Sequence, residues 1–414
     1  MRSNYSLWSL MMPTEHKAHT MGFGEFIALM ALMMSLMALS IDIMLPALSQ
    51  IGHDLGATHV NDNQLIISLL FLGFSLGMVI YGPMSDSFGR KPAVYLGLTI
   101  AIIGCTMSLF AESFFFMLAG RFLQGLGLAA ARIITVALVR DRYQGNEMGK
   151  VMSLIMTIFI LVPILAPALG QGILLIAHWR AVFVFILLLS ILVLVWFAIR
   201  QEETVPTHKR TPFSLRNIKE NLMLIFKNKQ VMGYTICSGF IFSAFLGYLN
   251  TSQQMFQDQY HLGIQFPLYF GALAIAVGCA SMVNAKFVMK YGMRRMSTFA
   301  LITILLASLI FLFFALSTHG KPPLWQLMIY LSIVLFCFGI LMGNLNGLAM
   351  EPLGKMAGLG ASLVGAVSTF VAVPFGTIIV QSYHQSITPI VMGFSIFGAL
   401  SLGVMYWVNT EEKT

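Results

Sequence analysis

The stretch WRAVFVFILLLSILVLVWFAIR, residues 179–200, indicates an integral membrane protein, because nineteen uncharged and mostly apolar residues lie between its two arginines. A helix needs about 20 such residues to cross the hydrocarbon core of a bilayer. Inside a bilayer every backbone N–H and C=O group must be paired within the protein, and a helix achieves this by itself. Residues 179–200 are therefore predicted to form a transmembrane helix.

Comparable apolar stretches lie on both sides of this one and predict a chain that crosses the membrane twelve times. The polar segment 201–230, which contains six lysine and arginine residues, separates six stretches before it from six after it. The stretches are 25–47, 63–83, 93–111, 114–138, 150–176, 179–200, 231–252, 266–288, 296–317, 324–348, 357–380 and 387–408. The predicted fold is all-α and integral to the membrane.

The two sets of six stretches carry a weak internal repeat. GPMSDSFGRK at 82–91 and AKFVMKYGMRR at 285–295, about 203 positions apart, are both short basic connections with a glycine turn. Duplicated six-helix bundles are an architecture of secondary transporters, so two pseudo-symmetric bundles are predicted. The expected parts of the chain are a tail at 1–24, a bundle at 25–200, a loop at 201–230, a bundle at 231–408 and a tail at 409–414.

The composition excludes a soluble protein of this size. Hydrophobic residues make up 58% of the 414 residues and charged residues only 10%, whereas soluble domains carry about 25% charged residues. The formal charge of +8 does not indicate nucleic-acid binding, since the basic residues lie between the apolar stretches. The four cysteines and nine histidines lack metal-ligand spacing, and there is no Walker motif. We therefore expect no metal, no other cofactor, no enzyme and no direct use of ATP; the proton gradient expected as the driving force rests on the charges and the resemblance described below.

Lysine and arginine predict the orientation, because they concentrate on the cytoplasmic side of membrane proteins. With the N-terminus in the cytoplasm, only Arg180 and Lys321 of the 24 basic residues lie at outer loops. Arg121 and Arg132 lie within the stretch 114–138, and the remaining twenty lie at cytoplasmic positions. Both termini and the central loop are therefore expected in the cytoplasm, in an inner membrane of the bacterial type.

Charged residues inside the apolar stretches are candidates for function, because a charge is costly to place in a membrane. Asp42 is the only acid in the apolar span of its stretch, and Arg121 is expected at a similar depth, so the two can pair. Arg132 follows Arg121 by eleven residues, close to three turns, and shares its helix face. Since a carboxylate removed from water binds a proton more readily, these three residues are the predicted proton-coupling group. The alternative for Arg132 is that it extends to the membrane surface.

Two further motifs combine turns, bends and charges. In GPMSDSFGRKP at 82–92 the glycines let the chain reverse, and the acid and bases can latch neighbouring helices. In PILAPALGQG at 163–172 the prolines remove backbone donors and bend a helix, while the glycines permit close packing. The residues concerned are Gly82, Asp86, Gly89, Arg90 and Lys91 in the first motif, and Pro163, Pro167, Gly170 and Gly172 in the second.

These motifs resemble the major facilitator superfamily, and within it the twelve-helix drug:proton antiporters of the Bcr/CflA type, over nearly the whole chain. GPMSDSFGRKP is similar to the superfamily signature G-x-L-a-D-r-x-G-R-[RK]. RFLQGLG at 121–127, PILAPALGQG and LSIDIMLPALSQI at 39–51 are similar to segments of the antiporters. The resemblance implies export, and a conformational latch in which Arg90 pairs with Asp141 while Asp86 faces a helix beginning near Gly358.

Polar residues within three of the stretches are candidates for binding substrate, or alternatively for hydrogen bonds between helices. They are Gln124, Tyr234, Tyr248, Asn250, Asn344 and Asn346.

The predicted function is proton-coupled export of small organic molecules, either drugs, a siderophore or a metabolite, by alternating access. An importer or facilitator of the same fold is the alternative, and a membrane-embedded enzyme or receptor is a further one. The expected partners are a small-molecule substrate and the lipid bilayer, without nucleic acid, and the resemblance implies a monomer.

Overall fold

The computed structural model describes residues 21–210, 216, 220, 223 and 225–410, and these residues contain twelve helical spans long and apolar enough to cross a membrane. The helices are α1 (Phe23–Asp42), α2 (Leu48–Asp54), α3 (Leu65–Phe88), α4 (Arg90–Leu109), α5 (Phe114–Arg142), α6 (Gly145–Ile176), α7 (Arg180–Arg200), α9 (Lys229–Gln253), α10 (Phe266–Tyr291), α11 (Met293–Ser317), α12 (Leu324–Met350), α13 (Ala357–Gln381) and α14 (Thr388–Thr410). Most of the two expected tails and part of the expected central loop lie outside the described residues. The predicted twelve-span fold is confirmed.

Short helical turns extend several of these spans. A 3-10 turn at Leu45–Ala47 joins α1 to α2, so that the first span runs from Phe23 to Asp54. Other short turns are Val60–Gln64 before α3, Thr207–Lys209 after α7, Gln254–Gln259 after α9, Gly263–Gln265 before α10 and Glu351–Met356 after α12. The first span is therefore not one straight helix, and its break lies at a predicted functional residue.

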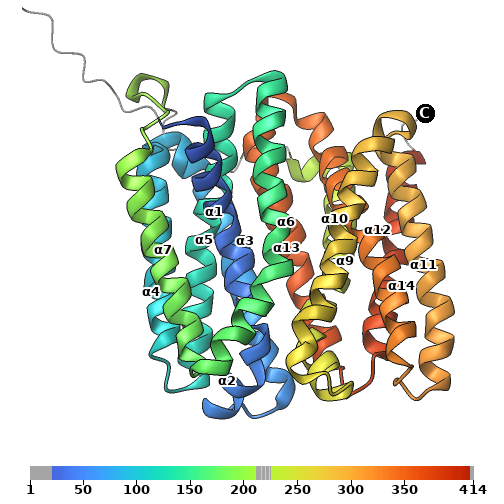
Figure 1. Cartoon of the computed structure of the whole chain (residues 1–414). Coiled ribbons are helices and arrows are strands. Elements are labelled where there is room, and N and C mark those ends of the chain that lie inside the picture. Colours follow the sequence, from blue (N-terminus) through green and yellow to red (C-terminus); the bar gives the residue numbers. More distant parts are fainter. Residues whose placement is uncertain (1–20, 211–215, 217–219, 221–222, 224, 411–414) are drawn as a thin grey trace, which may run out of the picture.

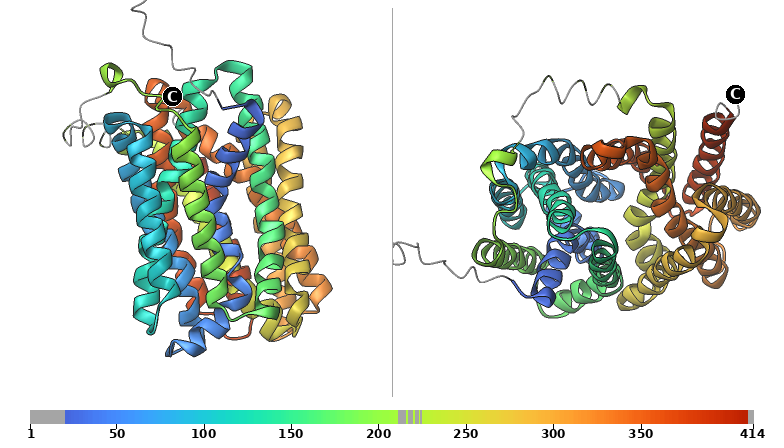
Figure 2. Two further views of the ribbon diagram at one scale, coloured as in Figure 1. Left: turned by 60° about the vertical axis from the view of Figure 1, so that its left-hand side comes forward. Right: turned by 90° about the horizontal axis from the view of Figure 1, so that it is seen from above.

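The spans form two bundles that stand side by side (Figures 1 and 2). The first bundle holds α1 to α7, coloured blue to green, and the second holds α9 to α14, coloured yellow to red. Between the bundles, α3 packs against α13 and α6 packs against α10. Within the bundles, α1 packs against α5 and α6, and α9 packs against α12, α13 and α14.

Glycine allows α3 and α5 to approach each other closely. A Cβ atom on Gly73 of α3 would lie 2.0 Å from the carbonyl oxygen of Phe122, and one on Gly125 of α5 would lie 1.9 Å from the carbonyl oxygen of Leu70. Backbones can meet in this way only where a side chain is missing, which is a common means of packing helices in membranes. The two helices therefore form a firm core of the first bundle.

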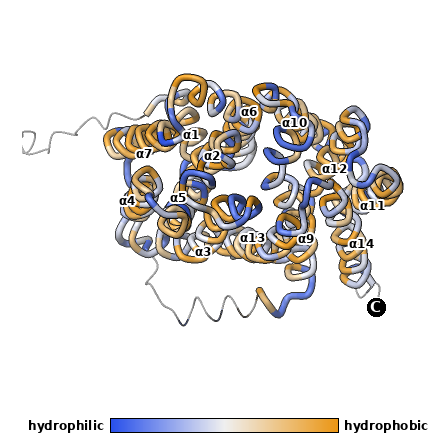
Figure 3. The backbone as a smooth tube through the Cα atoms, turned by 90° about the horizontal axis from the view of Figure 1, so that it is seen from below, coloured by the Kyte–Doolittle hydropathy of each residue, from blue (hydrophilic) through white to orange (hydrophobic). Residues whose placement is uncertain are grey.

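The outer faces of the bundles are apolar. Phe299 and Phe313 of α11 are each 72% exposed, and Ile199 of α7 is 74% exposed. Large apolar side chains in such positions are stable only against lipid. Figure 3 shows that hydrophobic residues dominate the spans.

The two ends of the molecule differ in charge. We call the end at which Phe23, Arg90, Arg142, Arg200 and Thr410 lie the basic end, which is uppermost in Figure 1. The opposite end carries α2 and the connections at 110–113, 177–179, 318–323 and 382–387. The chain leaves α7 at the basic end and continues through Gln201–Val205 along the surface of the first bundle.

Candidate functional site

Asp42 lies where the first span breaks. Pro46, four residues later, has no N–H group to donate to the Asp42 carbonyl, so the helix cannot continue in its regular pattern. Instead the N–H of Ile43 donates to Leu39 (3.1 Å) and that of Met44 to Ile41 (3.3 Å), and the 3-10 turn follows. The sequence therefore places a carboxylate at the last residue of a helix in the middle of a membrane span.

The Asp42 side chain is 4% exposed, and no described residue forms a hydrogen bond or ion pair with its carboxylate. A buried carboxylate without partners is costly to ionise, which is the property that a proton carrier needs. The Tyr248 hydroxyl of α9 lies within electrostatic range of the carboxylate. The Asp42 carboxylate thus lies near α9 of the second bundle.

Arg121 is fully buried in α5 and is bound by neutral acceptors. Its guanidinium donates to the carbonyl oxygens of Ile66 (3.3 Å) and Ser40 (2.9 Å) and to Gln124 Oε1 (2.6 Å). The predicted pair between Arg121 and Asp42 is wrong: the arginine binds the backbone of α1 two residues before the acid. Residues two apart project about 200° apart around a helix, so Ser40 faces α5 while Asp42 faces away from it.

Gln124 accepts a hydrogen bond from Arg121 and in turn contacts α1. Its Nε2 atom also donates to Ser40 Oγ (3.4 Å), and the side chain is buried. Gln124 therefore links α5 to α1, which favours the alternative of a helix-to-helix contact over contact with substrate.

Arg132 has a different environment from Arg121, although the two share a face of α5. Arg132 is exposed, lies about 15 Å by helical rise from the end of α5, and no described residue forms an ion pair with it. Its guanidinium lies 5.7 Å from the ring centre of Phe74 on α3. Because that face of α5 turns toward α1 and α3, an exposed arginine there indicates open space within the protein.

The predicted polar residues of the second bundle fall into two groups. Tyr248 is buried and stacks on Phe270 with ring centres 6.3 Å apart. Asn250 is buried and donates to Ser68 Oγ of α3 at 3.1 Å, so it joins the two bundles. Both residues lie at the boundary between the bundles.

The other three lie away from that boundary or bind neighbouring helices. Tyr234 donates to Asn409 Oδ1 (2.8 Å) at the basic end, between α9 and α14. Asn344 exchanges two hydrogen bonds with Asn284 of α10, each 2.9 Å long. Asn346 is half-buried in α12. The geometry of Tyr234 and Asn344 favours the alternative of contacts between helices.

Aromatic side chains that no sequence motif singled out gather on the second bundle. Phe245 stacks on Phe338 with ring centres 4.1 Å apart and lies beside Tyr248 at 6.2 Å. Phe242 stacks on Phe245 and meets Phe71 of α3 edge to face at 5.7 Å. This aromatic cluster offers apolar and π surfaces at the boundary between the bundles.

Hydrogen bonds between the bundles close the opposite end. Ser49 Oγ donates to Gln253 Oε1 (3.1 Å), and Asn61 Nδ2 donates to the carbonyl oxygen of Tyr383 (2.8 Å). Gln254 Nε2 donates to the carbonyl oxygen of Val60 (3.2 Å). We call these contacts the closed gate, because they join the first span and its neighbour to the second bundle.

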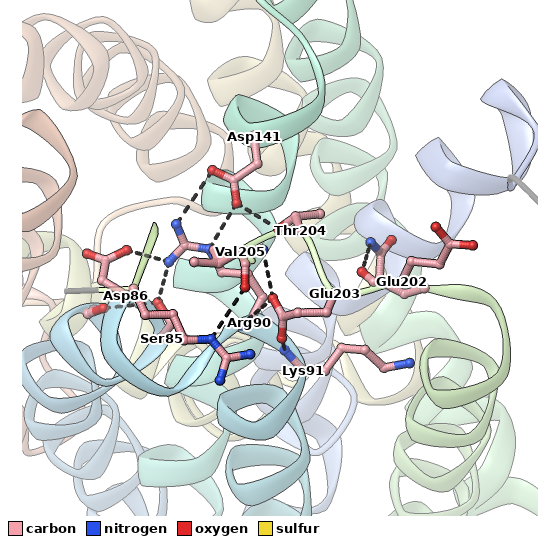
Figure 4. Close-up of polar contacts among 12 residues, drawn as sticks. Ser85, Asp86, Arg90, Lys91, Asp141, Glu202, Glu203, Thr204 and Val205 are labelled. Carbon is pink, nitrogen blue, oxygen red and sulfur yellow. Dashed lines mark hydrogen bonds and ion pairs between the residues drawn. The ribbon is translucent and has the colours of Figure 1, made fainter. Parts of the chain in front are cut away.

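At the basic end, Gly89 and Arg90 form the turn between α3 and α4 (Figure 4). Gly89 has φ of 105°, a conformation that other residues rarely adopt. Arg90 is buried, and its guanidinium donates to Asp141 Oδ2 (3.0 Å), Asp86 Oδ1 (2.5 Å) and Ser85 Oγ (2.8 Å). The structure therefore pairs Arg90 with Asp141, as the resemblance implies, and adds Asp86 and Ser85 to the same arginine.

The same motif reaches the second bundle through α3. A Cβ atom on Gly82 would lie 3.0 Å from Ser362 Oγ of α13. Asp86 lies one turn beyond Gly82 on the same side of α3; that it faces the beginning of α13 stays a prediction. A charge network in the first bundle is thus next to the contact between the bundles.

Glu203 and Thr204 complete the network from the central linker, and no sequence pattern pointed to them. Glu203 accepts from the backbone N–H groups of Arg90 and Lys91, both at 3.0 Å. Thr204 Oγ1 donates to Asp141 Oδ2 (2.8 Å). In addition, Lys91 Nζ donates to the Ala198 carbonyl of α7 (3.2 Å).

The proline- and glycine-containing motif lies within α6, which continues through Pro163 and Pro167. A Cβ atom on Gly170 would lie 1.8 Å from the carbonyl oxygen of Ile43, immediately after Asp42. A Cβ atom on Gly172 would meet no other atom within 4 Å. Of the two glycines expected to allow close packing, Gly170 does so, against the break in the first span.

The described residues hold no group of three or more histidine, cysteine, aspartate or glutamate side chains placed to bind a metal ion. The groups gathered at this site are the buried Asp42 carboxylate, the two arginines and the hydrogen-bonding and aromatic side chains between the bundles.

Comparisons with known proteins agree with this architecture. Residues 30–377 match the family described as the Major Facilitator Superfamily. An uncharacterised transporter of that type, YdgK from Bacillus subtilis, is 28% identical over 371 residues, covering 87% of this chain and 91% of YdgK. A bicyclomycin resistance protein homolog from Haemophilus influenzae is 28% identical over 390 residues, covering 94% and 96%. The multidrug resistance protein MdtL of Escherichia coli is 27% identical over 329 residues, covering 78% and 80%.

Solved structures share the fold at low sequence identity. The human organic anion transporter MFSD10 superposes with a TM-score of 0.70 at 16% identity, covering 94% of this chain and 99% of MFSD10. The xylose transporter XylE of Escherichia coli, in a partially occluded inward open conformation, also has a TM-score of 0.70, at 12% identity and 93% and 97% coverage.

The family match and the relatives bear on two predictions made from the sequence. The resemblance to transporters of the bicyclomycin-resistance type is confirmed. The family and the fold are those of transporters and not of enzymes. With its two six-helix bundles and its family match over residues 30–377, the chain belongs to the Major Facilitator Superfamily and is a multi-pass membrane transporter of small molecules.

Proposed function

We propose that this transporter exports small organic molecules in exchange for protons, by alternating access between the two bundles. The observation that carries the proposal is Asp42, a buried carboxylate without a described partner, which lies at a helix break and near α9 of the second bundle. Such a group can take up a proton from one side and release it to the other when the surrounding helices move.

We further propose that the basic end lies in the cytoplasm, together with the tails at 1–24 and 409–414 and the loop at 201–230. The concentration of lysine and arginine at that end supports this orientation. In a bacterium the membrane would then be the inner membrane. Each chain contains both bundles and the path between them, which supports a monomer as the working unit, and the molar mass of the purified protein in detergent tests this.

The proposed transport cycle alternates between contacts at the two ends of the molecule, the closed gate at the opposite end and the contacts at the basic end. Protonation of Asp42 from outside favours the state in which the closed gate has formed, since a neutral side chain can remain between the bundles without water. Release of the proton to the cytoplasm lets substrate bind, and the bundles rock so that the gate opens and the basic end closes. Arg121 holds α1 and α5 together through Ser40 and Gln124 and so fixes the position of Asp42.

The proposed substrates are amphipathic molecules of drug size. The names of two relatives, a bicyclomycin resistance protein homolog and a multidrug resistance protein, support a drug or a related metabolite. The aromatic cluster around Phe245 and Phe338 supplies surfaces for rings and apolar groups. Arg132, exposed in the interior of the first bundle, would bind a negatively charged or polar part of the same molecule and link its binding to the proton cycle.

The decisive experiment replaces the carboxylate. In everted vesicles acidified by respiration, addition of bicyclomycin, chloramphenicol or ethidium should release protons from vesicles with the unaltered protein, and Asp42→Asn should abolish this release. Glu112→Gln, at an exposed acid in the connection before α5, is the control and should retain it. Proton-driven export that is undiminished in Asp42→Asn would refute the assignment of Asp42.

The direction of transport separates this proposal from the alternative importer or facilitator. An exporter accumulates the drug inside everted vesicles at the expense of the proton gradient. An importer of the same fold would accumulate it in right-side-out vesicles, and a facilitator would equilibrate it without any dependence on the gradient.

A further inference from the structure

The first residues of the central linker bind the turn between α3 and α4. We call Gln201–Val205 the linker clasp. Its Glu203 carboxylate accepts from the N–H groups of Arg90 and Lys91 at 3.0 Å each, and its Oε1 atom also accepts from the N–H of Val205 at 3.0 Å. The clasp therefore folds around one carboxylate that is shared with the beginning of α4 (Figure 4).

A helix begins with N–H groups that have no acceptor within the helix, and the residue before it usually supplies one from its side chain. The residue before α4 is Gly89, which has no side chain. A Cβ atom on Gly89 would lie 2.5 Å from Glu203 Oε2. The glycine thus leaves room for the Glu203 carboxylate, which lies 113 residues after Arg90 in the chain. The carboxylate also lies favourably at the positive end of the helix dipole.

The clasp acts on the same residue as the charge network. The backbone N–H of Arg90 is held by Glu203, while the guanidinium of Arg90 is held by Asp86 and Asp141. Thr204 binds Asp141 from the other side at 2.8 Å. The position of the arginine is therefore set by its backbone from the linker and by its side chain from α3 and α5.

We propose that the linker clasp is a working part of the latch, and that Glu203 is the positioning residue that holds Arg90 in reach of Asp86 and Asp141. Removal of Glu203 frees the turn at Gly89, and the contact between α3 and α13 at the basic end then loosens. On this proposal, the part of the linker up to Val205 belongs structurally to the first bundle. The clasp acts on the balance between conformational states, whatever the substrate or the direction of transport.

Distances between spin labels test this without transport. The labels replace Gly149 at the start of α6 and Met289 at the end of α10, both exposed and on different bundles at the basic end, with Cys279→Ser to prevent labelling there. Glu203→Ala should raise the ratio of the longer to the shorter distance by about fivefold, the effect expected from loss of a helix cap. Glu203→Gln should raise it less, and Glu202→Gln, at the exposed neighbour, should leave it unchanged.

A double variant separates positioning from general stabilisation. If Glu203 acts through Arg90, Glu203→Ala should add no further change in the distances once Arg90→Ala is present, while both single variants shift them. Equal distances in Glu203→Ala and Glu202→Gln, or additive shifts with Arg90→Ala, would overturn the proposal. A lower melting temperature with unchanged distances would also overturn it, because Glu203 would then only cap α4. Loss of proton coupling in Asp42→Asn is measured separately, so failure of one proposal leaves the other intact.

Discussion

Asp42 and Arg121 lie close together in the fold and yet do not pair, and the reason is local geometry. The Arg121 guanidinium donates hydrogen bonds to the carbonyl oxygens of Ile66 and Ser40 and to the side chain of Gln124. All three acceptors are neutral, so no acid forms an ion pair with Arg121 there. The acid, two residues beyond Ser40, is buried and forms no ion pair with any described residue, which is why we propose it as the proton carrier.

Replacement of Arg132 should affect transport more than stability. Because the side chain is exposed and no described residue forms an ion pair with it, Arg132→Gln should change the free energy of unfolding by no more than about 0.5 kcal/mol. If the residue binds substrate, transport in vesicles should nevertheless fall, and Arg132→Lys should restore part of it through its charge. Thermal unfolding and drug-driven proton release measure the two effects.

Unchanged transport in the Arg132→Gln variant would contradict a role of Arg132 in substrate binding. Such a result would show that the arginine only extends into open space. Arg140→Gln, at the exposed end of α5, is the matched control and should alter neither quantity.

The close approach of the helices α3 and α5 limits which substitutions the first bundle can tolerate. The packing depends on glycines whose missing side chains are replaced by the carbonyl groups of the other helix. Such contacts cannot adjust by rotating a side chain, because backbone atoms are on both sides.

Gly125→Ala should therefore be strongly destabilising. The added methyl group would lie 1.9 Å from the Leu70 carbonyl oxygen, and the helices must separate to admit it. We expect a loss of about 1–3 kcal/mol, the usual effect of overpacking a core, seen as a lower melting temperature of the purified protein. Gly172→Ala, where a Cβ atom would meet nothing within 4 Å, is the control, and an equal loss in both variants would refute this account of the packing.

The elements also show how far sequence reasoning reaches. Hydropathy predicts the twelve spans because membrane helices must be apolar over a fixed length. The pairing of Arg90 with Asp141 is available from the resemblance, since its residues belong to a recurrent motif. The break at Asp42 could have been suspected from Pro46, but the side to which the acid points depends on the rotation of α1 in the bundle.

Other features had no signal in the sequence at all. Glu203 lies in a polar segment among other charged residues, and its partners are backbone groups of Arg90 and Lys91, which any sequence would present there. Likewise, Arg121 binds carbonyl oxygens, and the aromatic cluster joins residues of α9 and α12 that are far apart in the chain. Contacts to backbone and contacts between distant helices are invisible until the helices have been placed.

The two bundles are joined to each other by different kinds of contact at the two ends of the molecule. The opposite end is closed by individual hydrogen bonds such as that of Asn61 to Tyr383. The basic end has a charge network within the first bundle, next to the contact of Gly82 with Ser362. Movement between states therefore requires the gate to break a few hydrogen bonds while the bundles themselves remain intact.

Asn61→Ala should shift the molecule toward opening at the opposite end. The variant loses donors to the Tyr383 and Gln381 carbonyl oxygens, and each hydrogen bond contributes about 1 kcal/mol. Spin labels at Thr58 and His384, both exposed and on different bundles, should then show more of a longer distance. Gln265→Ala, exposed and outside the gate, should leave the distances unchanged, and no difference between the two variants would exclude Asn61 from the gate.

The closed gate has a consequence for how this transporter can diverge during evolution. Asn61 and Gln254 donate to main-chain carbonyl oxygens of Tyr383 and Val60, which every amino acid possesses. Selection for closure through these two bonds therefore acts on the amide donors, while the side chains at the accepting positions remain free to vary for other reasons. A closed gate of this kind can persist among relatives whose sequences have largely diverged, as long as the amide side chains of Asn61 and Gln254 are retained.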